Sequence, residues 1–267
     1  MSLTPNSDLT RTVKVRVSAN ELSERLHRVC LDAHPSPVKI LFQDTGLSVW
    51  THDNAKTIQA IVNEDLPEGG LKVGDPCVMC VEPKEFADLL RAKFNGKTVQ
   101  IETEAGQPIE IKSSDGSTAV YHPADESEAN IVPDHWILPV AKSGLRQFPM
   151  FDDEEATTSI KISRDEIMRG LTDMRVAKAP YVVFSFSDSG STCESGHWGA
   201  KTNRSRSPIT ADVDGENTEV CFTNNLDRIL NAVDGDNLTI QKHQKGGFAV
   251  IEGTTTTIVA TEAVKEV

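Results

Sequence analysis

The sequence predicts an α+β protein built as a tandem duplication. Three pairs of similar segments occur in the same order along the chain, and the two members of each pair lie 139–145 residues apart. Each half reads as a strand, a helix, several strands, a second helix and several more strands. A repeat of this length corresponds to a whole domain, so the sequence predicts two domains with the same order of elements.

The first pair of segments, residues 15–22 and 160–167, predicts the opening strand and helix of each half. Both segments alternate apolar and polar residues and then enter a helical pattern. A Ser-x-x-Glu capping box begins at Ser18 and again at Ser163, where the two side chains of the box satisfy free backbone N–H groups at the helix start. Apolar residues then follow on one helix face in each half: Leu22, Leu26 and Val29, and Ile167, Leu171 and Met174.

The second and third pairs predict the elements further along each half. Residues 42–46 and 186–190 share a Phe-x-Asp-x-Gly pattern, which is typical of a turn between two strands. Residues 86–101 and 226–240 each predict a short amphipathic helix, a glycine that ends it and an alternating strand. Because three pairs agree in both order and spacing, the pattern favours duplication over chance.

The repeats place a first domain at residues 1–124, a connector at residues 125–150 and a second domain at residues 151–267. Three prolines and four acidic residues favour an extended connector. The connector also carries Trp136 and several aliphatic residues, so we expect it to pack against another surface. The simpler alternative is that Trp136 and its neighbours cover the core of the first domain.

Composition excludes several classes of protein. With 38% hydrophobic and 25% charged residues, the chain is globular rather than disordered. No apolar stretch approaches the roughly 20 residues of a membrane helix, and the first residues lack the pattern of a signal peptide. Five cysteines in such a chain suggest reduced thiols. A net charge of −13 argues against a uniformly basic DNA-coating protein but leaves room for a locally basic face.

Catalytic and metal-binding motifs are not apparent in the sequence. Cys77 and Cys80 have metal-ligand spacing without a second pair of ligands, so buried structural thiols are the better interpretation. The acidic run at residues 152–155 lacks the pattern of a calcium loop and is interpreted as a solvated edge. No enzyme activity, metal or cofactor is therefore expected. An alternative of a different class is a small cysteine-dependent hydrolase with Cys193 or Cys221 as the nucleophile.

Taken together, these residues resemble the DNA polymerase sliding clamps of the proliferating cell nuclear antigen (PCNA) family. The resemblance covers about residues 13–261 and is most specific at residues 46–55, followed by residues 225–240 and the last strand at 257–260. It implies the DNA-clamp fold, in which each of two duplicated domains packs two helices on antiparallel sheet. It also implies a homotrimeric ring that encircles duplex DNA without sequence specificity and lines its hole with the helices.

The family resemblance also implies a function and partners. The ring would act as a processivity factor and as a docking platform for DNA polymerase, a clamp loader and other replication and repair proteins with a clamp-binding motif. Alternatives within the same fold are a checkpoint-type heterotrimer subunit and a viral processivity clamp. No membrane partner is expected. The location would be cytoplasmic and nucleoid-associated in an archaeal or viral setting, and nuclear in a eukaryote.

Basic residues of the predicted helices are the DNA-facing positions that the resemblance implies, with Arg91 and Arg169 ranked first. The others are Arg25, Arg28, Lys84, Arg164 and Arg228. Acidic residues on the same helices make them near neutral overall, so ordinary solvated helix faces are the alternative interpretation. Residues 201–206 form the most basic local segment, which is interpreted as a solvated hairpin or a loop that touches DNA.

Two further surfaces are implied by the resemblance. A partner-binding pocket would combine a turn, part of the connector and the end of the last strand: Asp53, Asn54, Ala55, Lys56, Ile58, Ile131, Val132, Ile137, Leu138, Ala260 and Thr261. Subunits would join by strand addition between two sheet edges: Thr118, Ala119, Val120 and Tyr121, and Thr192, Cys193, Glu194 and Ser195. Lys56 and Thr261 depart from the residue types of the family, which bears on partner preference.

Overall fold

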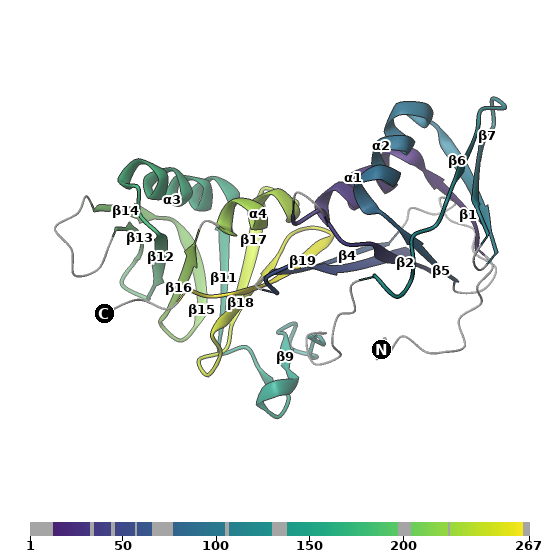
Figure 1. Ribbon diagram of the computed structural model, residues 1–267. Helices are drawn as coiled ribbons and strands as arrows, with labels where there is room; N and C mark the ends of the chain where they lie inside the picture. Colours follow the sequence, from purple (N-terminus) through teal and green to yellow (C-terminus); the bar gives the residue numbers. More distant parts are fainter. Residues whose placement is uncertain are drawn as a thin grey trace. The chain divides into compact units, whose positions relative to one another are not determined.

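The chain divides into two compact units, Ser2–Val132 and Pro133–Val267 (Figure 1). The computed structural model describes residues 13–32, 35–43, 46–56, 58–65, 77–104, 107–129, 138–196, 204–223 and 225–263. The division falls inside the segment predicted as the connector, residues 125–150.

The first unit contains two helices, α1 (Ala19–Arg28) and α2 (Pro83–Phe94). Its strands are β1 (Val13–Ser18), β2 (Val38–Gln43), β3 (Gly46–His52), β4 (Ile58–Asp65), β5 (Cys77–Val81), β6 (Thr98–Thr103), β7 (Ile109–Ser113) and β8 (Thr118–Tyr121). They pair antiparallel in the orders β1-β6-β7-β8 and β4-β3-β2-β5. The helices pack together, and the buried Ser23 hydroxyl donates to the Ala87 carbonyl at 2.9 Å.

The second unit contains α3 (Arg164–Ala177) and α4 (Asn225–Ala232). Its strands are β9 (Gln147–Phe148), β10 (Glu154–Glu155), β11 (Thr158–Ser163), β12 (Tyr181–Phe186), β13 (Ser191–Ser195), β14 (Ser205–Ile209), β15 (Ala211–Gly215), β16 (Thr218–Thr223), β17 (Asn237–Lys242), β18 (Phe248–Glu252) and β19 (Thr256–Thr261). They pair antiparallel in the orders β15-β11-β17-β18-β19 and β14-β13-β12-β16, with β9 and β10 as a separate small hairpin.

The two units repeat one topology, which confirms the predicted duplication and the α+β class. The order β4-β3-β2-β5 corresponds element by element to β14-β13-β12-β16, and β1-β6-β7-β8 corresponds to β11-β17-β18-β19. Strand β15, which pairs with the outer side of β11, has no counterpart among the described strands of the first unit. By this correspondence β4 is equivalent to β14, and β8 is equivalent to β19.

The predicted capping serines begin the first helix of each unit. Ser18 and Ser163 have extended backbones, and each hydroxyl accepts a hydrogen bond from the third residue of its helix, Glu21 or Glu166, at 3.3 Å. The apolar positions that follow are buried in both units. The short-range prediction of helix starts is therefore confirmed.

Gly170 lets α3 lie close to the sheet below it. A Cβ atom at this position would lie 2.6 Å from a ring carbon of the buried Phe184 and 2.8 Å from the sulfur of Cys193. We expect Gly170→Ala to lower the free energy of unfolding by about 1–3 kcal/mol, because overpacking outweighs the gain in helix propensity. Urea unfolding beside the exposed-site control Thr172→Ala measures this, and a variant as stable as the control would contradict the close approach.

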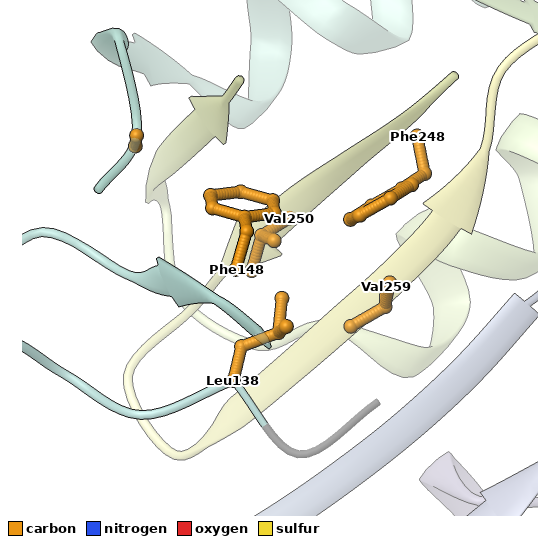
Figure 2. Close-up of a cluster of buried hydrophobic side chains, with 6 residues drawn as sticks. Leu138, Phe148, Phe248, Val250 and Val259 are labelled. Carbon is orange, nitrogen blue, oxygen red and sulfur yellow. The ribbon is translucent and has the colours of Figure 1, made fainter. Parts of the chain in front are cut away.

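The end of the predicted connector packs on the second unit. Leu138 and Phe148 join Phe248, Val250 and Val259 in one buried cluster (Figure 2). After this point the chain forms the β9–β10 hairpin and a 3-10 turn at Pro149–Phe151. The expectation that the connector packs against a surface is met for residues 138–150, while Trp136 lies outside the described residues.

Candidate nucleic-acid interface and docking surfaces

Helix α2 presents its cations on its exposed side. Lys84 and Arg91 are exposed, as is Lys93 in the last turn, whereas Phe86 and Leu90 on the opposite side are buried. Asp88 lies among the cations and faces His27 of α1 at 3.6 Å. This face is therefore mixed in charge with a small excess of cations.

Helix α3 also presents exposed cations, but they are held by neighbouring groups. The Arg169 guanidinium lies 3.1 Å from the Glu166 carboxylate and donates to the Pro208 carbonyl on β14 at 3.3 Å. Arg175 pairs with Asp227 of α4 at 3.0 Å. Both arginine side chains remain at least half exposed, so they can still meet a polyanion.

Two predicted DNA-facing residues, Arg25 and Arg164, are corrected by the structure. Arg25 is only 8% exposed, because it lies on the face of α1 that packs inward. Arg164 donates to the carbonyls of Leu230, Val233 and Gly235, so its guanidinium satisfies carbonyls in the last turn of α4 and in the segment that follows it. Neither side chain is presented to a ligand. Arg28 and Arg228 are half-buried and also make contacts within the protein.

Asp53 builds the turn that was predicted to line the partner pocket. Its backbone N–H donates to the Ile58 carbonyl at 2.9 Å, and its carboxylate accepts from the Ile58 N–H at 2.8 Å. Both residues are at most 1% exposed, so their predicted role as lining residues is wrong and they shape the turn instead. Asn54, Ala55 and Lys56 are exposed at its tip, and Lys56 has a left-handed backbone with φ of 56°.

The remaining predicted pocket residues fall in three groups. Ala260 on β19 is fully buried and Leu138 is 4% exposed, so both belong to the core and are corrected as well. Thr261 is exposed at the end of β19. Ile131, Val132 and Ile137 lie outside the described residues.

Of the two strands predicted as subunit edges, β8 lies at the end of its sheet and β13 does not. Strand β8 is an end strand of its sheet within the described residues, and Val120 on it is 61% exposed. Tyr121 is turned inward, with its ring 4.9 Å from that of Phe86, and burial raises the pKa of its phenol to about 12.

Strand β13, which was predicted as the second edge from Thr192 to Ser195, is an interior strand. It pairs with β12 on one side and with β14 on the other, and Cys193 and Ser195 are buried. Both rows of its backbone hydrogen-bonding groups are therefore used inside the unit. Within the described part of the chain, the end strand on the β13 side of this sheet is β14, and β16 is the end strand on the other side.

The described thiols fit a structural role. Burial raises the pKa of Cys193 to about 12, and it raises that of Cys30 and of Cys80 to about 11. A thiol of this kind is protonated near neutral pH and is a poor nucleophile, so Cys193 does not fit the hydrolase alternative. Cys221 is buried in a small cluster with Tyr181 and Val183. The side chain of Cys77 lies outside the described residues.

A polar network that sequence reasoning missed holds the chain that follows Leu138. Arg146 donates from Nη1 to the Leu138 carbonyl at 2.8 Å and from Nε to the Glu252 carboxylate at 2.7 Å. Gln241 links Arg146 to Glu252. Its side-chain oxygen accepts from the backbone N–H of Arg146 at 2.7 Å, and its side-chain nitrogen donates to the Glu252 carboxylate at 2.8 Å. Gln241 and Glu252 lie 95 and 106 positions after Arg146, so no local sequence pattern could reveal the network.

Further ligand sites receive no support from the described residues. No group of three or more His, Cys, Asp and Glu side chains there is arranged to hold a metal ion. Among the described helices, none is both long enough and apolar enough to cross a membrane. Glu154 of the acidic run instead contacts His243 at 2.9 Å and Lys245 at 2.6 Å.

Solved structures of sliding clamps resemble this chain along almost its whole length. PCNA from Entamoeba histolytica matches with a TM-score of 0.69 at 9% identity, covering 96% of this chain and 100% of that one. A. fulgidus PCNA, bound to the C-terminal region of FEN-1, matches with a TM-score of 0.67 at 14% identity, covering 95% and 99%. The DNA polymerase III beta subunit from Thermotoga maritima matches with a TM-score of 0.71 at 12% identity, covering 97% and 66%.

The comparisons therefore decide the fold. No protein-family model and no curated protein sequence matches the chain. Because the identities are only 9–14%, the assignment rests on the structural similarity alone, and this similarity spans both units. The chain has the fold of the DNA sliding clamps, as the resemblance in its sequence predicted.

Proposed function

We propose that this protein is a sliding clamp that encircles duplex DNA as a homotrimer and acts as a processivity factor. The observation that carries the proposal is the duplicated topology, which matches PCNA chains over at least 94% of this chain and at least 99% of theirs. A clamp of this kind acts by topology and breaks no bond. Light scattering is expected to give about three times the 29.1 kDa mass of one chain.

The charge distribution supports an assignment of the DNA-facing surface. Duplex DNA carries about one negative charge per 1.7 Å of its axis, so a clamp needs cations where the duplex passes. Lys84, Arg91, Arg169 and Arg175 are exposed on α2 and α3 in a chain with a net charge of −13. Acidic neighbours such as Asp88 and Glu166 keep these helices close to neutral, which suits sliding, because each phosphate contact is then weak and exchanges with salt.

Docking of partner proteins is the second part of the proposal. The A. fulgidus PCNA that this chain resembles binds the C-terminal region of FEN-1. By analogy, we place docking residues in each unit separately: Asn54 to Lys56 at the exposed turn of the first unit, and Thr261 with the end of the connector in the second unit. Arg146 and the Leu138 cluster would support docking in the second unit by fixing the end of the connector.

Reversing two cations tests the DNA-facing surface. We expect the double variant Arg91→Glu and Arg169→Glu to lower affinity for duplex DNA and to reduce processive synthesis. A plot of log affinity against log salt concentration should become shallower, with the magnitude of its slope smaller by about 0.9 for each lost phosphate contact. Lys161→Glu, an exposed cation on strand β11, is the matched control for charge. Unchanged salt dependence in the double variant would remove these two residues from the interface.

A further inference from the structure

The free edge of β14 is interrupted by a proline. Within the described part of the chain β14 ends its sheet, and its ladder with β13 runs from Ser205 opposite Ser195 to Ile209 opposite Ser191. Pro208 lies inside this ladder, opposite Thr192. Because proline has no N–H, a paired strand accommodates it only where its nitrogen faces the free edge.

The direction of the Pro208 backbone fixes that of its neighbours. In an antiparallel strand the N–H and C=O of one residue point to the same side, and the side alternates along the strand. Ser205, Ser207 and Ile209 therefore direct these groups to β13. Arg206 directs its N–H and C=O to the free edge, on the same side as Pro208.

Arg169 donates a hydrogen bond to the backbone carbonyl of Pro208, which is the only backbone polar group that a proline has. Its Nη1 donates to the Pro208 carbonyl at 3.3 Å, which agrees with a carbonyl turned away from β13. The guanidinium is held in place by Glu166 at 3.1 Å. A second link between α3 and β14, from the Ser207 hydroxyl to the Asp173 carboxylate at 3.1 Å, keeps the helix over this strand.

The edge of β14 therefore has an open half and a closed half. A strand that approached it would find a donor and an acceptor at Arg206. At Pro208 it would find no donor and an acceptor that is already bonded. Proline at an edge is a recognised means of limiting strand addition.

In the proposed homotrimer subunits would join by strand addition, and β14 would then pair with a strand of a second copy of this chain. We propose that Pro208 with Arg169 confines this contact to the half of β14 that ends at Ser207 and so limits its strength. The inference rests on the proposed homotrimer. The occupant is the copy's β8, an end strand among the described residues that has only four residues, which suits a short ladder. Val120, 61% exposed on β8, is an apolar side chain that such a contact would cover.

Restoring the missing donor tests the proposal. Pro208→Thr adds an N–H directed to the free edge and introduces a good strand former. One added hydrogen bond should tighten the dissociation constant of each subunit contact by about three- to tenfold. Arg206→Pro removes the donor of the open half and should weaken the contact by at least as much. Arg169→Gln frees the Pro208 carbonyl and, like Pro208→Thr, should tighten the subunit contact.

The measurement is self-association by sedimentation velocity over a dilution series, together with the rate of subunit exchange between two fluorescently labelled preparations. Pro139→Thr is the matched control, because it makes the same substitution at an exposed proline outside β14. Thermal melting identifies any variant that does not fold. Pro208→Thr replaces a proline by an ordinary strand residue, so it is expected to fold.

Each outcome decides between two claims. Tighter association and slower exchange in Pro208→Thr, with the reverse in Arg206→Pro, support the proposal. If the wild type forms trimers and Pro208→Thr behaves like Pro139→Thr, the role of Pro208 is overturned and the homotrimer stands. If all variants stay monomeric at the highest concentration, the proposed homotrimer is overturned together with this inference.

Discussion

Replacing Phe148 with alanine is expected to lower the free energy of unfolding by about 3–5 kcal/mol. Phe148 is fully buried in the cluster shown in Figure 2. Its ring centroid lies 5.4 Å from that of Phe248 and 5.6 Å from that of His243. Alanine would remove the ring from the cluster and leave a cavity between the remaining side chains.

The size of the effect is measured by urea unfolding followed by circular dichroism. Phe148→Leu is the matched control, because it keeps most of the apolar volume and is expected to cost much less. Leu138 is buried against the same cluster, so Phe148→Ala should also loosen the end of the connector. A loss below about 1 kcal/mol would show that the cluster does not hold this segment.

Replacing Arg146 with methionine is expected to lower the free energy of unfolding by about 2–4 kcal/mol. The Arg146 and Glu252 side chains are 19% and 20% exposed, so removal of the guanidinium leaves a largely buried carboxylate without its ion-pair partner. The Leu138 carbonyl and the Thr257 hydroxyl lose a donor at the same time. Methionine keeps the apolar stem, so the cost reports the polar network rather than lost packing.

Two controls separate this network from a general effect of charge. Lys142→Met removes an exposed cation four residues earlier and should change the free energy of unfolding by less than about 0.5 kcal/mol. Arg146→Met with Glu252→Gln should recover part of the loss, because the carboxylate charge is gone. Equal melting temperatures for Arg146→Met and Lys142→Met would contradict the role of the network.

Local patterns predicted a large part of the fold because they act over a few residues. The serines at positions 18 and 163 cap helices as their spacing to glutamate indicated. The duplication was visible because the same strand, helix and turn signals recur at one spacing, and the sheets of the two units confirm it. Periodicity also predicted the buried faces of the helices.

Side-chain roles were predicted less well because they depend on contacts between distant segments. Helix membership alone does not tell whether an arginine faces solvent, and Arg164 instead satisfies carbonyls 66–71 residues away. Residues 205–209 are mostly polar and include Pro208, so they lack the apolar alternation that would reveal a strand. For this reason the sequence did not show that β14 pairs outside β13, and the predicted edge lies one strand inside the end of the sheet.

Topological retention on DNA tests the central claim most directly. The protein is allowed to thread over the free end of a duplex tethered to a bead by its other end, and that end is then blocked with a bulky protein or left open. After a wash with salt high enough to suppress direct contacts, the account predicts that the protein stays on the blocked duplex and leaves the open one. Equal retention on both duplexes would contradict a clamp that encircles DNA.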